Sequence, residues 1–131
     1  MLPTSVWATA RSNRENSAED STAVYELRVY YTAPGKLNDL LTRFREHTLQ
    51  LFVKHGLKSV AYWLPMDEPQ KSSTLFYLLE HPSREAAAAN WKAFGDDPEW
   101  KSVREKSEAN GKLVEKVEST FLTLADFSPN L

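Results

Sequence analysis

Apolar side chains alternate with other side chains along residues 24–32, the first regular segment of the chain. One side of this segment carries Tyr25, Leu27, Val29 and Tyr31. The other side is less apolar and carries Val24, Glu26, Arg28 and Tyr30. Such alternation, rich in aromatic and β-branched residues, is typical of a β-strand. Residues 57–64 and 113–124 predict two more strands, and a slip of apolar parity between Val114 and Val117 predicts a bulge or a later start in the last one.

Residues 74–81 are predicted to form a further strand, and its central part is apolar on both sides. Leu75, Tyr77 and Leu79 fall on one face of a sheet, and Phe76 and Leu78 fall on the other. Because a large apolar surface is normally covered, both faces of this strand need a partner. The pattern leaves open which of the two sides meets the helices of the same chain.

Two segments show the three- and four-residue spacing of amphipathic helices. The apolar stripe of residues 36–55 consists of Leu37, Leu40, Leu41, Phe44, Leu51 and Phe52. The second segment begins at a predicted N-cap, Ser83, and is then interrupted. Asp97 and Pro98 supply a second N-cap and a proline at the first helical position, which predicts a short helix ending near residue 109.

The elements occur in the order β-α-β-β-α-β, with the second helix split in two. This order predicts an α+β domain of the ferredoxin-like type with a four-stranded antiparallel sheet. Helices in this arrangement cover only one face of the sheet, so large apolar side chains stay uncovered on the other. A second copy of the same face, related by a two-fold axis, would cover them. The sequence therefore predicts an isologous homodimer, with the chain itself as its partner.

Five residues are candidates for this dimer interface. They are Phe76 and Leu78 together with the less apolar side of the first strand, namely Glu26, Arg28 and Tyr30. Because a charge pair facing the helices inside one chain is costly, we expect Arg28 to meet a carboxylate on the dimer side. The alternative is that Glu26 and Arg28 pair only with each other at a solvated end of the sheet, where such pairs contribute little.

Composition narrows the class of protein. The 131 residues suit one domain, expected at residues 24–131, because residues 11–22 lack a hydrophobic period and residues 1–23 are predicted to form a disordered arm. The absence of cysteine excludes disulfides and thiolate metal sites. With 16 basic and 18 acidic residues there is no electrostatic case for a nucleic-acid partner. No apolar run is long enough to span a bilayer and no convincing signal peptide is present, so a cytoplasmic location is expected.

The residues that suggest chemistry do not form a motif. The candidate ligand-binding residues are His47, Thr48, Tyr62, Trp91 and Trp100, which are expected around an apolar pocket between helices and sheet. The alternatives are core packing of the aromatic rings and a hydrogen bond from Thr48 to the preceding turn. The three histidines give no metal-binding pattern and no glycine-rich phosphate loop is present. No metal, cofactor or catalytic residue is therefore expected.

From the first predicted strand onward the chain resembles the NIPSNAP family of the dimeric α/β-barrel superfamily. The resemblance covers about residues 24–129 and is carried by Tyr25-Glu26-Leu27-Arg28 with Tyr30, Pro34-Gly35-Lys36, His55-Gly56 ahead of Tyr62-Trp63, and Asp97-Pro98-Glu99-Trp100. It implies a ferredoxin-like fold whose sheets pair face to face into a dimeric barrel. It implies no settled enzymatic role, although relatives in the wider superfamily include cofactor-less monooxygenases, haem-degrading enzymes and polyketide cyclases.

The sequence is compatible with three functions. The first is a homodimer that binds a small apolar or aromatic molecule in a cleft near His47, Tyr62, Trp91 and Trp100. The second is a cofactor-independent enzyme of the monooxygenase or cyclase type, in which His47 is the general base and must reach a substrate proton. The third is a structural or interaction module with a filled core and no ligand. Fold alone does not decide among them.

Overall fold

The computed structural model describes residues 23–131, in which strands and helices follow the order expected from the sequence. The predicted arm, residues 1–23, lies outside the described residues except for Ala23. The elements are β1 (Val24–Thr32), α2 (Leu37–Arg43), η2 (Phe44–Thr48), α3 (Leu49–Lys54), β2 (Lys58–Trp63), η3 (Gln70–Ser72), β3 (Thr74–His81), α4 (Arg84–Asp96), α5 (Pro98–Ser107) and β4 (Val114–Leu122).

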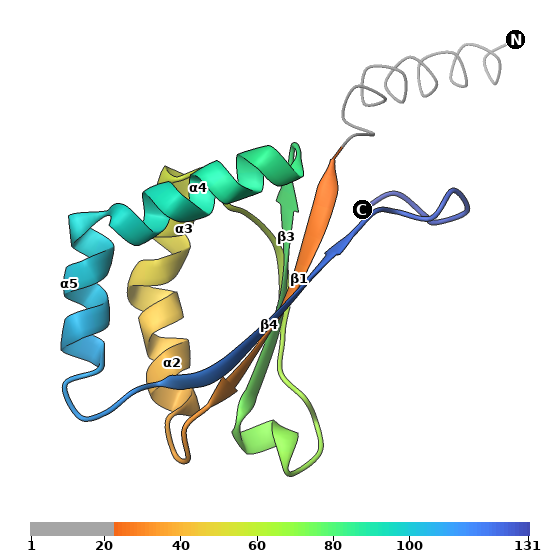
Figure 1. Ribbon diagram of the computed structural model, residues 1–131. Helices are drawn as coiled ribbons and strands as arrows, with labels where there is room; N and C mark the ends of the chain where they lie inside the picture. The colour runs from red at the N-terminus through yellow and green to blue at the C-terminus, as the bar shows by residue number, and fades with distance from the viewer. Residues whose placement is uncertain (1–22) are drawn as a thin grey trace, which may run out of the picture.

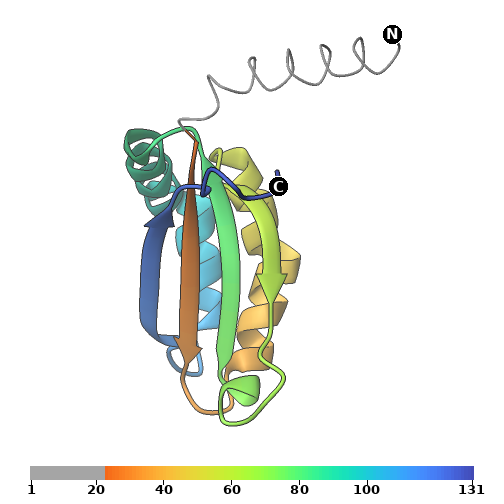
Figure 2. The same ribbon diagram turned by 90° about the vertical axis from the view of Figure 1, so that its right-hand side faces the viewer.

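The four strands form one antiparallel sheet in the order β2-β3-β1-β4. Helices α2 to α5 all lie on one face of this sheet (Figure 1), and none of the helices within residues 23–131 lies on the opposite face, seen directly in Figure 2. Where Tyr31 and Thr32 pair with β4, the register skips Glu115. This bulge accounts for the slip of apolar parity in the sequence. The predicted ferredoxin-like α+β fold is confirmed.

Side-chain caps fix the starts of the two halves of the split helix. The Ser83 hydroxyl accepts a hydrogen bond from the N–H of Ala86 at 3.0 Å, and the Asp97 carboxylate accepts one from the N–H of Glu99 at 2.8 Å. Each bond satisfies an N–H group that has no partner inside its own helix. Helices α4 and α5 therefore begin where the sequence predicts, and the chain changes direction between them (Figure 1).

The long helix expected at residues 36–55 contains a π-helical turn, η2, between α2 and α3. Here the N–H of Leu49 bonds to the carbonyl of Phe44, five residues earlier. A regular α-helix turns by about 100° per residue and would place these two side chains about 140° apart. The wider turn instead brings both of them to the same cleft, at the β2 edge of the sheet. Such turns are rare and occur frequently at functional sites.

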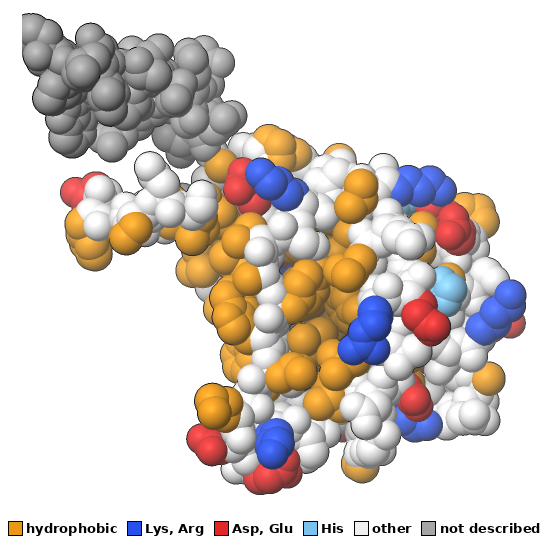
Figure 3. Space-filling model, turned by 180° about the vertical axis from the view of Figure 1, so that it is seen from behind, with side chains coloured by type: hydrophobic (Ala, Val, Ile, Leu, Met, Phe, Trp, Pro, Cys, Tyr) orange, Lys and Arg blue, Asp and Glu red, His pale blue; other side chains and the backbone are white. Residues whose placement is uncertain are grey.

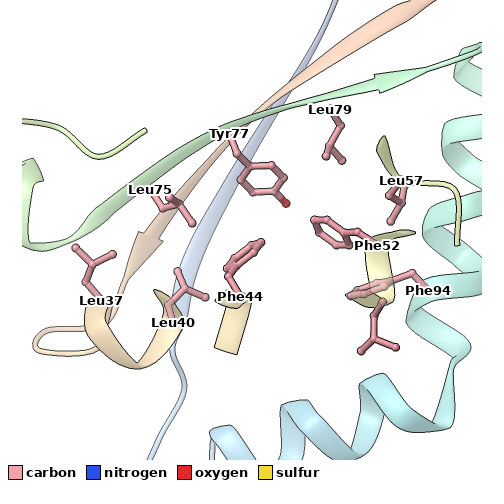
Figure 4. Packing of buried hydrophobic residues seen from close by; sticks show 10 residues of the cluster. Leu37, Leu40, Phe44, Phe52, Leu57, Leu75, Tyr77, Leu79 and Phe94 are labelled. Carbon is pink, nitrogen blue, oxygen red and sulfur yellow. The ribbon is translucent and has the colours of Figure 1, made fainter. Parts of the chain in front are cut away.

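The main hydrophobic core lies between the helices and the sheet. The side of β3 that faces this core consists of its odd-numbered residues, Leu75, Tyr77 and Leu79. Tyr77 lies near the middle of the cluster (Figure 4), with its ring centroid 5.5 Å from that of Phe44. Phe76 and Leu78 alternate with these residues and therefore point to the open face. The structure thus decides which side of this strand meets the helices.

Candidate functional site

A buried carboxylate, Glu26 of β1, is the centre of a polar network beneath the helices. This residue is 2% exposed. Its Oε2 accepts hydrogen bonds from Arg28 Nη1 at 2.9 Å and from Ser119 Oγ at 2.6 Å. Its Oε1 accepts one from Trp91 Nε1 at 2.8 Å and lies 2.8 Å from His81 Nε2. The partners come from β1, β4, α4 and β3, so this one carboxylate joins four elements of the fold.

Arg28 extends the network to two tyrosines. Its Nε donates to the hydroxyl of Tyr77 at 2.8 Å and its Nη2 donates to the hydroxyl of Tyr30 at 3.0 Å. The Tyr77 hydroxyl in turn donates to the Tyr30 hydroxyl at 2.8 Å. The guanidinium also lies over the ring of Trp91, with its carbon 4.1 Å from the ring centroid. These contacts together offset the cost of removing the cation from water.

This arrangement corrects the expected location of the charged side of β1. Glu26, Arg28 and Tyr30 lie opposite the odd-numbered, core residues of β3 and therefore face the helices, not a second copy of the sheet. Of the five candidate interface residues, only Phe76 and Leu78 lie on the open face. The prediction rested on the free-energy cost of burying an ion pair. It could not include the hydrogen bonds from distant segments that offset this cost.

The network determines the charge states of its members. Burial by itself would raise the pKa of Glu26, but hydrogen bonds to four partners lower it to about 2, and the bond to His81 has the largest lowering effect. Burial by itself would lower the pKa of Arg28, but the adjacent tyrosines and Glu26 raise it above its ordinary value. Burial raises the pKa of Tyr77 well above its ordinary value. At neutral pH the network therefore holds an ion pair and an uncharged Tyr77 hydroxyl.

We expect acid to destabilise the protein through Glu26. Its pKa is about 2 in the folded chain against an ordinary value of 4.5, so the folded state favours the ionised form. This contribution, about 3 kcal/mol by linkage, is present above the ordinary pKa and is lost as the pH falls towards the folded one. In urea titrations at decreasing pH, the difference in free energy of unfolding between the wild type and Glu26→Gln should shrink. A difference that does not change with pH would contradict this role.

A small cavity of about 30 Å³ lies between β1 and the helices. Its lining residues are Tyr30, Arg43, Phe44, Thr48, Phe52, Phe94 and Trp100. Arg43 is buried, and its Nη1 lies 3.1 Å from Ser107 Oγ and 3.2 Å from a Glu108 carboxylate oxygen. The Nε of Arg43 has no hydrogen-bond partner in the described part of the chain. A space of this size holds about one water molecule, so it cannot take an organic ligand as it stands.

A larger cleft, of about 280 Å³, opens at the β2 edge of the sheet. Figure 3 shows this side of the molecule, where hydrophobic side chains gather in a hollow area of the surface. The lining residues, which we call the edge cleft, are Leu41, Phe44, Arg45, Leu49, Tyr62, Trp63, Leu64 and Leu75. All but Arg45 are apolar or aromatic, which is the composition typical of small-molecule sites.

Two irregularities of the backbone shape the edge cleft. The π-turn brings Phe44 and Leu49 to the same wall. Strand β2 forms the other wall with Tyr62 and Trp63, and its register with β3 shifts just before them, between Ser59 and Ala61. The hydroxyls of Ser59 and Tyr62 are hydrogen-bonded at 2.7 Å. Both π-turns and bulges of edge strands are over-represented at functional sites. Their meeting at one apolar cleft makes it the candidate ligand site.

The five residues predicted to bind a ligand are divided among different places. Tyr62 lines the edge cleft, whereas Thr48 and Trp100 line the small cavity. Trp91 belongs to the polar network. His47 is exposed on the π-turn and lines neither space. Thr48 also donates to a backbone carbonyl of the preceding turn at 3.3 Å, which is the alternative that its place in the stripe suggested.

Sequence reasoning missed two parts of this region. Arg45 and Leu49 fall outside the α-helical stripe, so only a five-residue apolar spacing from Phe44 would have pointed to the π-turn. His81 was placed at the end of the predicted strand 74–81 and given no role, but the structure buries it fully beside Glu26. The available signal was parity, because His81 continues the odd-numbered side of β3 that carries Leu79.

The described residues hold neither a metal-ligand cluster nor a helix that could span a membrane. Within residues 23–131, no three His, Asp or Glu side chains are grouped so that they could hold a metal ion. None of the helices in the described part of the chain combines the length and the apolar character that crossing a bilayer requires.

The sequence and fold of this chain are similar to those of one protein family. The family model described as NIPSNAP matches residues 25–129. Among solved structures, an uncharacterized NIPSNAP-like domain protein from Burkholderia xenovorans is 18% identical, with a TM-score of 0.71 over 85% of this chain and 92% of that chain. A NIPSNAP family protein from Agrobacterium tumefaciens is 20% identical, with a TM-score of 0.70 over 82% of this chain and 97% of that chain.

A more distant match is a monooxygenase from Streptomyces coelicolor in complex with the ligand nanaomycin D. It is 13% identical, with a TM-score of 0.53 over 85% of this chain and 96% of that chain. At this identity the match shows a shared fold and nothing of the activity. No curated protein matches the sequence.

Proposed function

The chain belongs to the NIPSNAP family, and from this premise we propose that it acts as a homodimer that binds a small apolar or aromatic molecule in the edge cleft. The observation that carries this proposal is the cleft itself, an apolar space of about 280 Å³ built by a π-turn and a bulged edge strand. A hydrophobic ligand would gain free energy by leaving water for such a lining.

The other two hypotheses have less support. An enzyme that uses His47 as its general base needs this side chain beside a substrate, but His47 is exposed and lines neither the cleft nor the cavity. A module with a filled core agrees with the small size of the inner cavity, about 30 Å³. It gives no reason for an open apolar cleft at the sheet edge, which a purely structural domain would be expected to close.

The open face of the sheet supports the homodimer. On this face Leu27 of β1 pairs with Leu78 of β3, and Phe76 pairs with Trp63 of β2. Trp63 is 50% exposed and Leu122 at the other edge is 41% exposed. Apolar side chains gather over β2, β3 and β1 on this face, whereas β4 adds Lys116, Glu118 and Thr120 beside Leu122. An apolar patch with a polar rim marks an interaction site. An identical open face is a self-complementary cover, because a two-fold axis places the same residues on both sides of the contact.

Replacing Leu49 by glutamine tests the cleft directly. Leu49 lines the cleft and is 37% exposed, so the change should leave the fold intact and remove apolar contact from the ligand. We expect a neutral aromatic fluorophore, N-phenyl-1-naphthylamine, to bind the wild type with increased emission. We expect it to bind Leu49→Gln about fivefold to tenfold more weakly, which corresponds to the loss of one or two buried methylene groups.

Val53 provides the matched control for this experiment. It lies one helical turn beyond Leu49 on α3, is 80% exposed and does not line the cleft. Val53→Gln makes a similar apolar-to-amide change and should leave the affinity for the fluorophore within about twofold. Equal weakening in both variants, or no binding to the wild type, would refute the edge cleft as the ligand site.

A further inference from the structure

Among the described residues, Arg45 is the only charged one that lines the edge cleft. It lies on the π-turn and is exposed. Within residues 23–131 its guanidinium makes no ion pair and no hydrogen bond, whereas Arg28 and Arg43 are each paired with a glutamate of the same chain. The Tyr62 hydroxyl, another polar group of the lining, is already bonded to Ser59. The cleft therefore offers a ligand an apolar wall and one unpaired cation.

The position of Arg45 depends on the same irregularity that forms the cleft. The π-turn Phe44–Thr48 includes Arg45 and orients the residues that line the space on its helical wall. A guanidinium at the rim of an apolar wall is matched by a ligand with an apolar body and an anionic end. The planar fork of arginine binds a carboxylate through two parallel hydrogen bonds, and one guanidinium balances one negative charge.

From these observations we infer that the ligand of the edge cleft is a small amphipathic monocarboxylate. Its ring system or short chain lies against Leu41, Leu49 and Tyr62, and its carboxylate is bound by Arg45. The volume of about 280 Å³ is just below the range of about 300–1,000 Å³ usual for drug-sized ligands, which favours a body of one or two rings. A phosphate dianion is less suitable because a single cation leaves half of its charge without a partner. The inference rests on the proposed function of the cleft and adds the chemical class of the ligand.

A pair of probes that differ only in charge tests the inference. 1-Naphthaleneacetate and 1-naphthaleneacetamide share the same ring system, and isothermal titration calorimetry can compare their affinities on the full chain. We expect the wild type to bind the acid about tenfold more tightly than the amide, since a hydrogen bond to a charged group is worth more than one to a neutral group. Added salt should weaken the binding of the acid and leave the amide unchanged.

Variants of Arg45 then assign the difference to one side chain. Arg45→Gln should weaken the binding of the acid about tenfold and leave the affinity for the amide within about twofold of wild type. Arg45→Lys should give an intermediate affinity for the acid, because lysine keeps the charge but lacks the planar guanidinium fork. Lys101→Gln is the matched control: it removes one positive charge from an exposed site on α5 that does not line the cleft. It should leave the affinities for both probes unchanged.

Each outcome separates the inference from the function on which it rests. If both probes bind equally and Arg45→Gln changes neither affinity, the carboxylate assignment is wrong, whereas an effect of Leu49→Gln on both probes would still support the cleft. If Lys101→Gln weakens the binding of the acid as much as Arg45→Gln does, the preference for the acid comes from the net charge of the protein and not from a specific contact with Arg45. If neither probe binds the wild type, the inference and the ligand-binding role both fail.

Discussion

Glu26→Gln is expected to lower the free energy of unfolding by about 3–5 kcal/mol, the cost of leaving a buried charge without its partner. The replacement keeps the shape of the side chain but removes its charge, and Arg28 stays buried beside it. The amide also presents an NH₂ group in place of one oxygen, either to Arg28 Nη1 and Ser119 Oγ, which donate to Oε2, or to Trp91 Nε1, which donates to Oε1. Few single changes in this chain remove so many hydrogen bonds at once.

Urea denaturation followed by circular dichroism measures this effect, with two-state behaviour checked by a second probe. Glu99→Gln is a suitable control, because Glu99 lies on α5 on the helix side of the molecule, is exposed, and pairs with Lys54 at 4.0 Å. Surface pairs of this kind contribute about 0–1 kcal/mol. A loss below about 1 kcal/mol in Glu26→Gln would show that the network contributes little to stability.

The strands were predictable because their local pattern and their tertiary role agree. Alternation located β1 at residues 24–32 and β3 at residues 74–81, which are the observed bounds. The caps Ser83 and Asp97 located the starts of α4 and α5, since both act through neighbouring backbone N–H groups. The face assignment of β3 was not predictable, because Phe76 and Leu78 are as apolar as the residues that alternate with them.

The polar network was not predictable because its stability depends on residues far apart in the chain. Ser119 lies 93 positions from Glu26 and Trp91 lies 65 positions away. A single segment reveals the cost of burying Glu26 and Arg28, but not the partners that offset it. The pair was therefore predicted to lie on the open face, where the structure has apolar side chains such as Leu27 and Leu78.

The edge cleft escaped prediction for a different reason. The apolar positions Phe44 and Leu51 are seven residues apart, which fits a regular α-helix as well as it fits the observed one. Nothing in that spacing requires the π-turn, so Arg45 and Leu49 were not among the candidate residues. Among the predicted ligand-binding residues, only Tyr62 lies in this cleft.

Leu78→Arg is expected to convert the proposed homodimer into monomers. Leu78 lies on the open face near the middle of the sheet, where it pairs with Leu27 across the two central strands. A two-fold axis would place the change in both copies, so two like charges would be buried in one apolar contact without partners. A cost of at least about 4 kcal/mol raises the dissociation constant at least about 1,000-fold.

Sedimentation velocity over a dilution series measures this result, and circular dichroism checks that the variant remains folded. Val53→Arg serves as the control, because it places the same charge on α3, on the helix side of the molecule, at a position that is 80% exposed. We expect this control to dimerise like the wild type. A wild type that is monomeric at micromolar concentration, or a Leu78→Arg variant that remains dimeric, would exclude the open face as the interface. Leu78 does not line the edge cleft. The affinity of a neutral probe for the monomeric variant would therefore show whether ligand binding in the cleft requires the second copy of the chain.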